Sequence, residues 1–312
     1  MTERIPLILD VDTGIDDAAA ICLAVHSPNA ELLSISTVAG NTIIENATRN
    51  TLDVLDILGA TDVPVYRGAS RPLVRELFTA RYAHGNNGAG GAELAHTERG
   101  VGDLRGPASI VYHAHTRPGE VTLVCLGPLT NLAIALNVEP ELPSMLKKVV
   151  IMGGAFWTPG NIKPGHYAEF NLYVDPEAAD QVFRANWPDI SAVGLDVTHA
   201  APVSAEVWSL IRNSNSAPAQ LIQALYRSRV ENPDTGQSYI HDAMAVAAAL
   251  DPDLIDWEPH DIEMQTDDVH RGQSRLVPGK TVQVAREVDA LAFMQHFYER
   301  LGITSTQNPT KG

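Results

Sequence analysis

The stretch LILDVDTGIDDAAA (residues 7–20) decides the fold, because it joins an apolar strand to an apolar helix through a cluster of acids. The pattern predicts a buried strand over 5–9 and a helix over 16–27. Four aspartates fall within eight positions between them: Asp10, Asp12, Asp16 and Asp17. The first two share one face of the strand end, and the last two fall in the first helical turn, where the helix dipole favours carboxylates.

The alternative interpretation is that one of these acids caps the helix and the others are solvated. Capping explains one or two acids, but it does not explain four acids around a buried strand end. Carboxylates this close together raise one another's pKa unless a cation neutralises them. A hard divalent cation with oxygen ligands, Ca²⁺ or Mg²⁺, removes the repulsion. The stretch therefore predicts a metal site at the end of the first strand.

The composition narrows the class of protein. The chain has 312 residues, 45% of them hydrophobic, which suffices for a large core. Its net charge of −16 argues against nucleic acid or an anionic membrane as the main partner. The two cysteines lie in apolar surroundings and form no disulfide framework or zinc pattern. No signal peptide or membrane span is recognisable, so we expect a cytoplasmic protein.

Short apolar runs alternate with helical patterns along the chain, which predicts an α/β fold with a mainly parallel central sheet covered by helices on both faces. Further strands are expected at 31–40, 62–68, 120–128, 146–154 and 190–198. Further helices are expected at 42–60, 129–138, 175–186 and 239–250. The segments 68–118 and 155–174 lack this rhythm and are expected to be long functional loops.

Polar residues that follow directly after an apolar strand carry special weight, because ligands of open α/β sheets bind outside the carboxyl ends of the strands. Five places qualify: the four aspartates, Asn41 after STVAG, GPLTN (127–131), MGG (152–154) and LDVTH (195–199). We expect these places to meet at one edge of the sheet.

A fifth acid lies at the start of the Ala-rich helix, in the sequence YIHDAMAVAAAL (239–250). Asp242 alone could be an N-cap, and His241 alone could be a hydrogen-bonded core histidine. Together, at a buried helix start, they could supply a metal ligand and a proton donor.

Two irregular segments add candidate binding residues. Asn161, Glu169 and Asn171 are placed in a loop before a helix that starts near Asp175, and such side chains suit hydroxyl groups of a sugar. The alternative is ordinary loop polarity. His84 lies in the Gly-rich segment AHGNNGAGG (83–91), which could close over a site.

These residues resemble the inosine–uridine-type nucleoside hydrolase family. DVDTGIDDA (10–18) resembles the family's N-terminal signature, and the following segments come in the family's order: VAGN (38–41), HG (84–85), GPLTNLA (127–133), MGGA (152–155), GN…AEFN…DPEAA (160–179), LDVTH (195–199), HDA (241–243) and VQVAREVDALAF (282–293). The match covers roughly residues 5–300.

The resemblance implies one α/β domain over residues 1–312, with the nucleoside hydrolase fold and its Rossmann-like core. It implies calcium-dependent hydrolysis of the N-glycosidic bond of a ribonucleoside to ribose and free base. The metal ligands would be Asp12, Asp17, Asp242 and the main-chain carbonyl of Leu126, with Asp12 also acting as general base. A homodimer or homotetramer with a role in nucleoside salvage would follow as well.

The resemblance also implies the substrate contacts. His241 would protonate the leaving base, and the carboxylates would stabilise a ribosyl cation. The remaining contacts would be Asp16, Asn41, His84, Met152, Asn161, Glu169, Phe170, Asn171 and Tyr226. The sequence departs from the family pattern at Thr13, where proline is usual, and at 162–168, which is about two residues longer and bears on the role of Asn161.

Two other functions remain open from the sequence. A phosphatase of the haloacid dehalogenase type would use Asp10 as nucleophile and Asp12 as general acid, but it leaves the pair Asp16–Asp17 and the HDA segment unexplained. A catalytically inactive ribose- or nucleoside-binding protein would keep the same acids without releasing base. The base preference is not indicated by any residue of the sequence.

Overall fold

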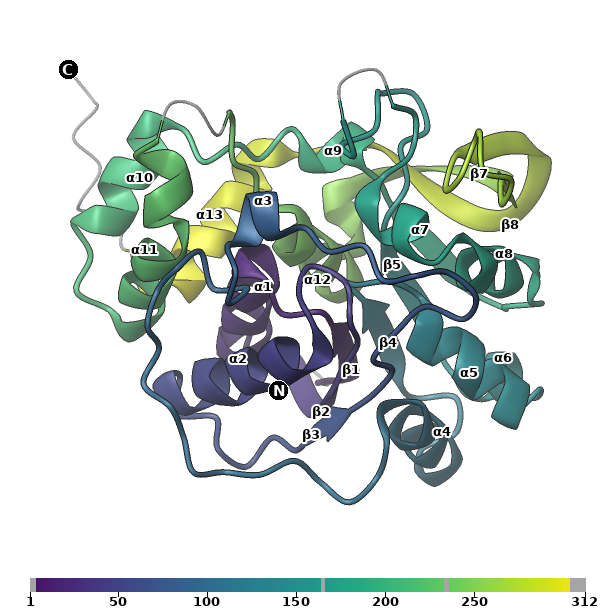
Figure 1. Ribbon diagram of the computed structural model, residues 1–312, viewed down its shortest axis with the longest axis horizontal. Coiled ribbons are helices and arrows are strands. Elements are labelled where there is room, and N and C mark those ends of the chain that lie inside the picture. The colour runs from purple at the N-terminus through teal and green to yellow at the C-terminus, as the bar shows by residue number, and fades with distance from the viewer. Residues whose placement is uncertain (1–3, 164–165, 233–235, 304–312) are drawn as a thin grey trace.

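The computed structural model describes residues 4–163, 166–232 and 236–303 (Figure 1). Within these ranges eight strands form one sheet in the order β3-β2-β1-β4-β5-β6-β8-β7. The strands are β1 (Ile5–Val11), β2 (Ala30–Thr37), β3 (Val65–Arg67), β4 (Thr122–Cys125), β5 (Lys148–Met152), β6 (Ile190–Val193), β7 (Ile255–Met264) and β8 (Ser274–Val288). Neighbours pair in parallel except β7 with β8, which confirms the predicted, mainly parallel sheet.

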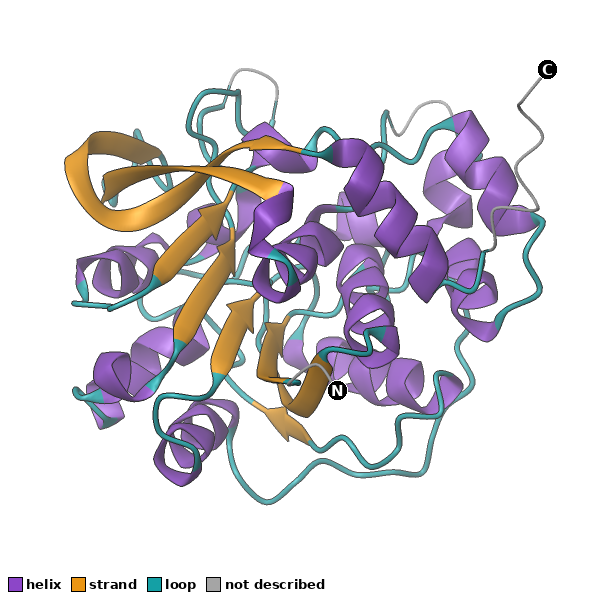
Figure 2. Ribbon diagram, turned by 180° about the vertical axis from the view of Figure 1, so that it is seen from behind, coloured by secondary structure: helices purple, strands orange, loops and turns teal. Residues whose placement is uncertain are grey.

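Helices cover both faces of the sheet (Figures 1 and 2). They are α1 (Ile15–His26), α2 (Ile44–Ile57), α3 (Arg81–His84), α4 (Gly106–Thr116), α5 (Thr130–Val138), α6 (Leu142–Met145), α7 (Phe170–Val174), α8 (Pro176–Arg184), α9 (Leu195–Thr198), α10 (Ala205–Arg212), α11 (Ala217–Val230), α12 (His241–Leu250) and α13 (Ala290–Arg300). No helix in the described ranges is long and apolar enough to cross a membrane.

Side-chain alternation along β1 divides the core into two layers. Leu7, Leu9 and Val11 pack with α1, α11 and α12 on one face, and Ile8 packs with α4 and α5 on the other. Both cysteines are buried in these layers. The sheet and its two helical layers form a single domain.

The position of β1 explains where a ligand binds. Chain order along the sheet runs from β1 outward to β2 and β3 on one side, and to β4, β5 and β6 on the other. The crossovers to the two sides lie on opposite faces, so a crevice opens between the carboxyl ends of β1 and β4. The acids after β1 lie at this crevice.

The structure corrects three details of the sequence prediction. The strand expected over 190–198 ends at Val193, and the next residues form the short helix α9. The segment 68–118 contains α3 and α4. Asn171 lies in α7, with Glu169 as its N-cap, where a loop was expected. Periodicity fails here because α3, α7 and α9 span only one turn or so.

Candidate active site

A cavity of about 190 Å³ opens at the carboxyl end of the sheet. Most residues that the sequence singled out line it: Asp16, Asn41, His84, Leu126, Met152, Asn161, Glu169, Phe170, Asn171, Tyr226, His241 and Asp242. Asp12 and Asp17 lie against Asn41, one of these lining residues. The structure therefore brings all the predicted site residues to one place.

The acids come from the first turns of two neighbouring helices. Asp16 and Asp17 begin α1, Asp242 begins α12, and the two helices pack along each other. One carboxylate oxygen from each of the three lies within 4.8 Å of the others. All three are buried. Each helix N-terminus stabilises the acids of its own first turn, but it does not remove the repulsion between the acids of the two helices. A metal ion bound by all three carboxylates would remove this repulsion.

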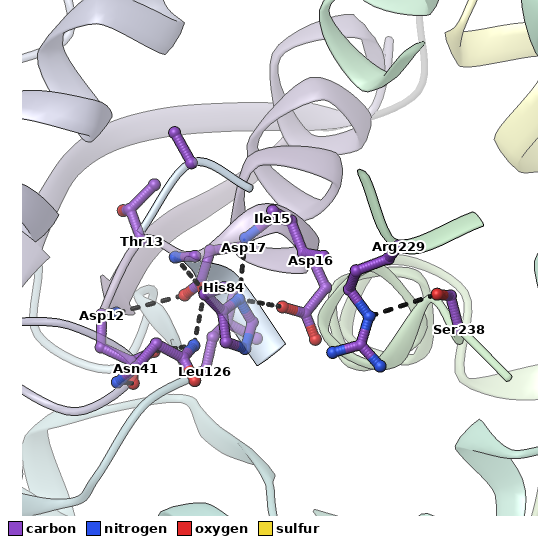
Figure 3. Close-up of polar contacts among 12 residues, drawn as sticks. Asp12, Thr13, Ile15, Asp16, Asp17, Asn41, His84, Leu126, Arg229 and Ser238 are labelled. Carbon is purple, nitrogen blue, oxygen red and sulfur yellow. Dashed lines mark hydrogen bonds and ion pairs between the residues drawn. The ribbon is translucent and has the colours of Figure 1, made fainter. Parts of the chain in front are cut away.

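Asp12 is held beside this group by hydrogen bonds (Figure 3). The main-chain N–H of Asn41 donates to one carboxylate oxygen of Asp12 at 2.6 Å, and its side-chain amide donates to the other at 3.1 Å. The same amide donates to Asp17 at 3.2 Å. Gly40 makes room for this arrangement, since a Cβ there would lie 2.2 Å from an Asp12 oxygen.

Burial and mutual repulsion raise the pKa values of the acids. Burial, and then the neighbouring charge of Asp17, raise the pKa of Asp16 to about 7 and that of Asp12 well above its usual value. The pKa of Asp242 is raised well above its usual value by burial and by Asp16. One buried oxygen of Asp16 and one of Asp242 have no hydrogen-bond partner among the residues that the structure describes. Buried, unpartnered oxygens in a group of neighbouring carboxylates fit a hard cation.

The opposite wall carries the amide and carboxylate groups expected for a sugar. Asn171 donates to the carbonyls of Leu126 at 2.8 Å and Met152 at 3.1 Å, which fixes its side chain. Glu169 accepts from the main-chain N–H groups of Asn171 and Leu172 at the start of α7. Burial raises the pKa of Glu169 to about 7. Asn161 lies in an exposed loop at the rim.

The two histidines have distinct partners. His241 Nδ1 lies 2.7 Å from the hydroxyl of Thr198, and burial, followed by the charge of His199, lowers its pKa to about 3. His84 Nδ1 accepts from the N–H of Ile15 at the start of α1, so it anchors that helix (Figure 3). Burial lowers the pKa of His84 to about 3. Both imidazoles are therefore neutral at pH 7, and Nε2 of His84 carries its hydrogen.

Tyr226 is less available to a ligand than the sequence suggested. Its ring is buried, and its hydroxyl donates to the carbonyl of Tyr239 at 3.2 Å. The hydroxyl hydrogen of Tyr226 is therefore already used within the protein.

Sequence reasoning missed one wall of the cavity. Its residues are Tyr82, His199, Arg229, Gln237, Ser238 and Tyr239. The rings of His199 and Tyr239 lie 4.5 Å apart, and Tyr239 lies 5.4 Å from His241. Arg229 Nε donates to Ser238 at 3.3 Å (Figure 3). Two segments singled out in the sequence reach this wall: LDVTH ends on His199, and YIHDAMAVAAAL begins with Tyr239.

Comparisons with known proteins agree with this geometry. Residues 7–295 match the family model described as inosine-uridine preferring nucleoside hydrolase. The chain is 40% identical to an inosine-uridine preferring nucleoside hydrolase of Leishmania major over 83% of each chain. It is 34% identical to a probable uridine nucleosidase of Arabidopsis thaliana over 96% of this chain and 98% of that one.

Solved structures give the same result. A plant nucleoside hydrolase superposes with a TM-score of 0.89 at 32% identity, over 96% of this chain and 99% of that one. A purine-preferring ribonucleoside hydrolase from Gardnerella vaginalis gives a TM-score of 0.88 at 32% identity, over 95% and 98% of the two chains. The names of these relatives differ in the preferred base.

Proposed function

The chain belongs to the inosine-uridine preferring nucleoside hydrolase family and is an enzyme of this kind, and we propose that it hydrolyses the N-glycosidic bond of ribonucleosides to ribose and free base in a calcium-dependent reaction. The observation that supports this most directly is the group of buried carboxylates of Asp16, Asp17 and Asp242 beside a cavity walled by amide and carboxylate groups.

We assign the calcium ligands to Asp12, Asp17, Asp242 and the carbonyl of Leu126. The carboxylates that the structure groups most closely are Asp16, Asp17 and Asp242, and Asp12 lies beside Asp17 through the shared Asn41 amide. The fit rests on the buried, unpartnered oxygen of Asp242 and on the all-oxygen donor set, which hard cations prefer. When bound, calcium supplies positive charge that lowers the pKa of a water and holds two ribose hydroxyls. The Leu126 carbonyl keeps a second lone pair beside its bond from Asn171.

Asp12 is the proposed general base. It lies next to the other acids and is oriented through both oxygens by Asn41, so its carboxylate is fixed before a substrate arrives. It takes one proton from the attacking water as the bond between base and ribose breaks. Asp16, Asn41 and Asn171 would contact the ribose hydroxyls, and Glu169 and Asn161 would contact the 5′-hydroxyl. Nearby carboxylates stabilise the developing ribosyl cation.

His241 is the proposed donor to the leaving base. Because Thr198 occupies Nδ1, Nε2 is the nitrogen left for the base. With Nδ1 accepting from the Thr198 hydroxyl, the neutral imidazole carries its hydrogen on Nε2 and can pass it to a base nitrogen as Nδ1 takes the hydroxyl hydrogen. Thr198 regains a hydrogen from solvent, and Asp12 releases to solvent the proton that it took from the attacking water. His84, Met152, Phe170 and Tyr226 would shape the rest of the pocket.

The phosphatase alternative gains no support from the site. Asp10 is fully buried, does not line the cavity, and accepts hydrogen bonds from Ser36 and Asn131. These hydrogen bonds tie the Asp10 side chain to β2 and α5, and the phosphatase mechanism gives no role to Asp16, Asp17 and Asp242.

We further propose a homodimer or homotetramer, a cytoplasmic location and a part in nucleoside salvage. Analytical ultracentrifugation of the purified protein measures the first of these directly, and a monomer at micromolar concentration would refute it.

The deciding experiment measures free base and reducing sugar from inosine, uridine, cytidine and adenosine. The protein is assayed as purified, after chelation, and after chelation and calcium restoration. We expect hydrolysis that chelation removes and calcium restores, and the rank order gives the base preference. Calcium binding without base release from any of the four would favour the binding-protein alternative. Release of phosphate from a phosphate ester would favour the phosphatase.

A further inference from the structure

Asn131 is a fully buried amide that joins three segments of the chain at the carboxyl end of the sheet. It is the second residue of α5 and does not line the cavity. Its side-chain N–H groups donate to Asp10 Oδ1 at 2.7 Å and to the carbonyl of Thr37 at 2.9 Å. Its oxygen accepts from the N–H of Ala69 at 2.8 Å.

Two glycines leave the room that this amide occupies. A Cβ on Gly68 would lie 2.3 Å from the side-chain oxygen of Asn131, and one on Gly106 would lie 3.1 Å from its nitrogen. Both amide hydrogens and one oxygen lone pair are used. The space and the partners therefore fit asparagine, whereas aspartate would lose both donors and face the carboxylate of Asp10.

One path of hydrogen bonds leads from Asn131 to Asp12. Ala69, which donates to Asn131, accepts from the N–H of Ala39 at 2.9 Å. Two residues further along the chain, the N–H of Asn41 donates to Asp12 at 2.6 Å. Asn131 thus restrains both ends of the turn that carries Asn41, because it also holds Thr37 at the end of β2.

A second path leads to Leu126. Asp10, whose side chain accepts from Asn131 and from Ser36, also accepts through its main-chain carbonyl from the N–H of Leu126 at 2.7 Å. The next atoms along the chain form the Leu126 carbonyl, a proposed calcium ligand. The amide therefore links both sides of the crevice between β1 and β4.

We propose that Asn131 is a positioning residue for the calcium site, which fixes the Asp12 carboxylate through the turn of Asn41 and the Leu126 carbonyl through Asp10. The inference rests on the proposed function. Groups that orient metal ligands without touching the metal typically change metal affinity or activity 10–100-fold when they are removed. The same range is expected for Asn131.

The test compares three variants. N131D keeps the side-chain shape but removes both donors. G106A would place a Cβ 2.9 Å from the Cα of Gly68 and 3.1 Å from the Asn131 amide nitrogen, so it displaces the surroundings of the amide without removing a polar group. L132A, at the next residue of α5, removes a fully buried apolar side chain from the core and leaves the hydrogen bonds in place. Calcium affinity is measured by titration calorimetry, kcat and KM at saturating calcium, and thermal unfolding in chelator.

We expect N131D to bind calcium at least 10-fold more weakly and to lose at least 10-fold in kcat, with KM changed less than 3-fold. G106A should weaken calcium binding about 3-fold or more. L132A should lower the unfolding temperature while its calcium affinity stays within 2-fold of wild type. Folded N131D with calcium affinity and kcat within 2-fold of wild type would overturn the inference.

Three further outcomes bear on the inference, and the last of them concerns the proposed function on which it rests. If N131D does not fold, G106A decides: unchanged calcium affinity would overturn the inference. Equal loss of affinity in L132A would also overturn it, because the effect would then be general destabilisation. A wild-type protein that neither binds calcium nor hydrolyses nucleosides would overturn the proposed function and this inference together, whereas the other outcomes leave the proposed function intact.

Discussion

Asp12 is the single residue on which the proposed chemistry depends most. D12N keeps the size of the side chain but cannot accept a proton from water, so we expect kcat to fall by about 10²–10⁴ at saturating calcium. Far-ultraviolet circular dichroism should stay close to wild type, which shows that the variant is folded.

D53N is the matched control for D12N. Asp53 is equally buried, on α2, and is bonded to His96 and Thr97 away from the cavity. Its replacement should cost stability and leave kcat unchanged. A D12N protein that keeps more than a tenth of wild-type kcat would remove Asp12 as the general base.

Glu169 gives a prediction about pH. Burial raises the pKa of Glu169 from 4.5 to about 7, so the folded protein keeps this carboxyl protonated while the unfolded chain has ionised it. Its contribution to stability is thus complete below pH 4.5 and is lost as the pH rises towards 7, by roughly 1.4 kcal/mol for each unit of pKa difference. The stability of metal-free wild type relative to E169Q should fall across this range.

Urea unfolding of both proteins in chelator at several pH values between 4.5 and 8 measures this difference. Subtracting the free energy of unfolding of E169Q from that of wild type cancels the contribution of the other acids, because these titrate in both proteins. A difference that is constant with pH would show that Glu169 ionises alike in the folded and unfolded states.

At the level of elements, α9 holds a residue of α12 in place. Thr198 ends α9 and contacts Nδ1 of His241 at the start of α12. H241A should lower kcat for inosine by at least 100-fold, and T198V, which keeps the imidazole but frees Nδ1, by about 10-fold. Both variants should lose less kcat on a nitrophenyl riboside than on inosine, because the nitrophenyl leaving group departs without a proton. Equal losses on both substrates would exclude His241 as the donor.

The sequence predicted the strands and helices with a clear apolar pattern, whatever their length. Strands β1 to β6 and helices α1, α2, α5, α8 and α12 follow from apolar runs and helical spacing. The antiparallel hairpin β7–β8 and the helices α10, α11 and α13 were not predicted. Along β7, burial does not alternate regularly, so its pattern resembles neither a half-buried strand nor a helix.

The same limit applies to the site. Acids after β1 and at the start of α12 could be predicted, because strand ends and helix starts can be read from local sequence. The grouping of Tyr82, Arg229, Gln237 and Ser238 around His199 and Tyr239 could not, since these residues come from α3, from the ends of α9 and α11 and from the segment before α12. Their neighbourhood depends on how distant segments pack. The hydrogen bond from Tyr226 to Tyr239 also could not be predicted, because it depends on how α11 packs against the segment before α12.

For the whole molecule, the acids predict that calcium stabilises the fold. Asp12, Asp16, Asp17 and Asp242 are buried with raised pKa values, so they repel one another in the metal-free protein. Free calcium at 100 times its Kd adds about 2.7 kcal/mol to the free energy of unfolding. This corresponds to an increase of roughly 5 °C in Tm.

Differential scanning calorimetry in chelator and in calcium measures the increase, with magnesium as the comparison ion. D242N, which removes one ligand and one negative charge, should unfold at a higher temperature than wild type in chelator and gain less from calcium. A Tm of wild type that does not respond to calcium would argue against a bound metal.

The proposed ligands lie far apart in the chain: Asp12 and Asp17 precede and begin α1, whereas Asp242 begins α12. During synthesis the ribosome therefore releases the first acids long before the last one exists. Until α12 docks on α1, the nascent chain holds half a binding site, and water solvates its charges. The metal ion can therefore bind tightly only after α12 has been synthesised and has docked on α1. A chain truncated before α12 is expected to bind no cation tightly at the acids that follow β1.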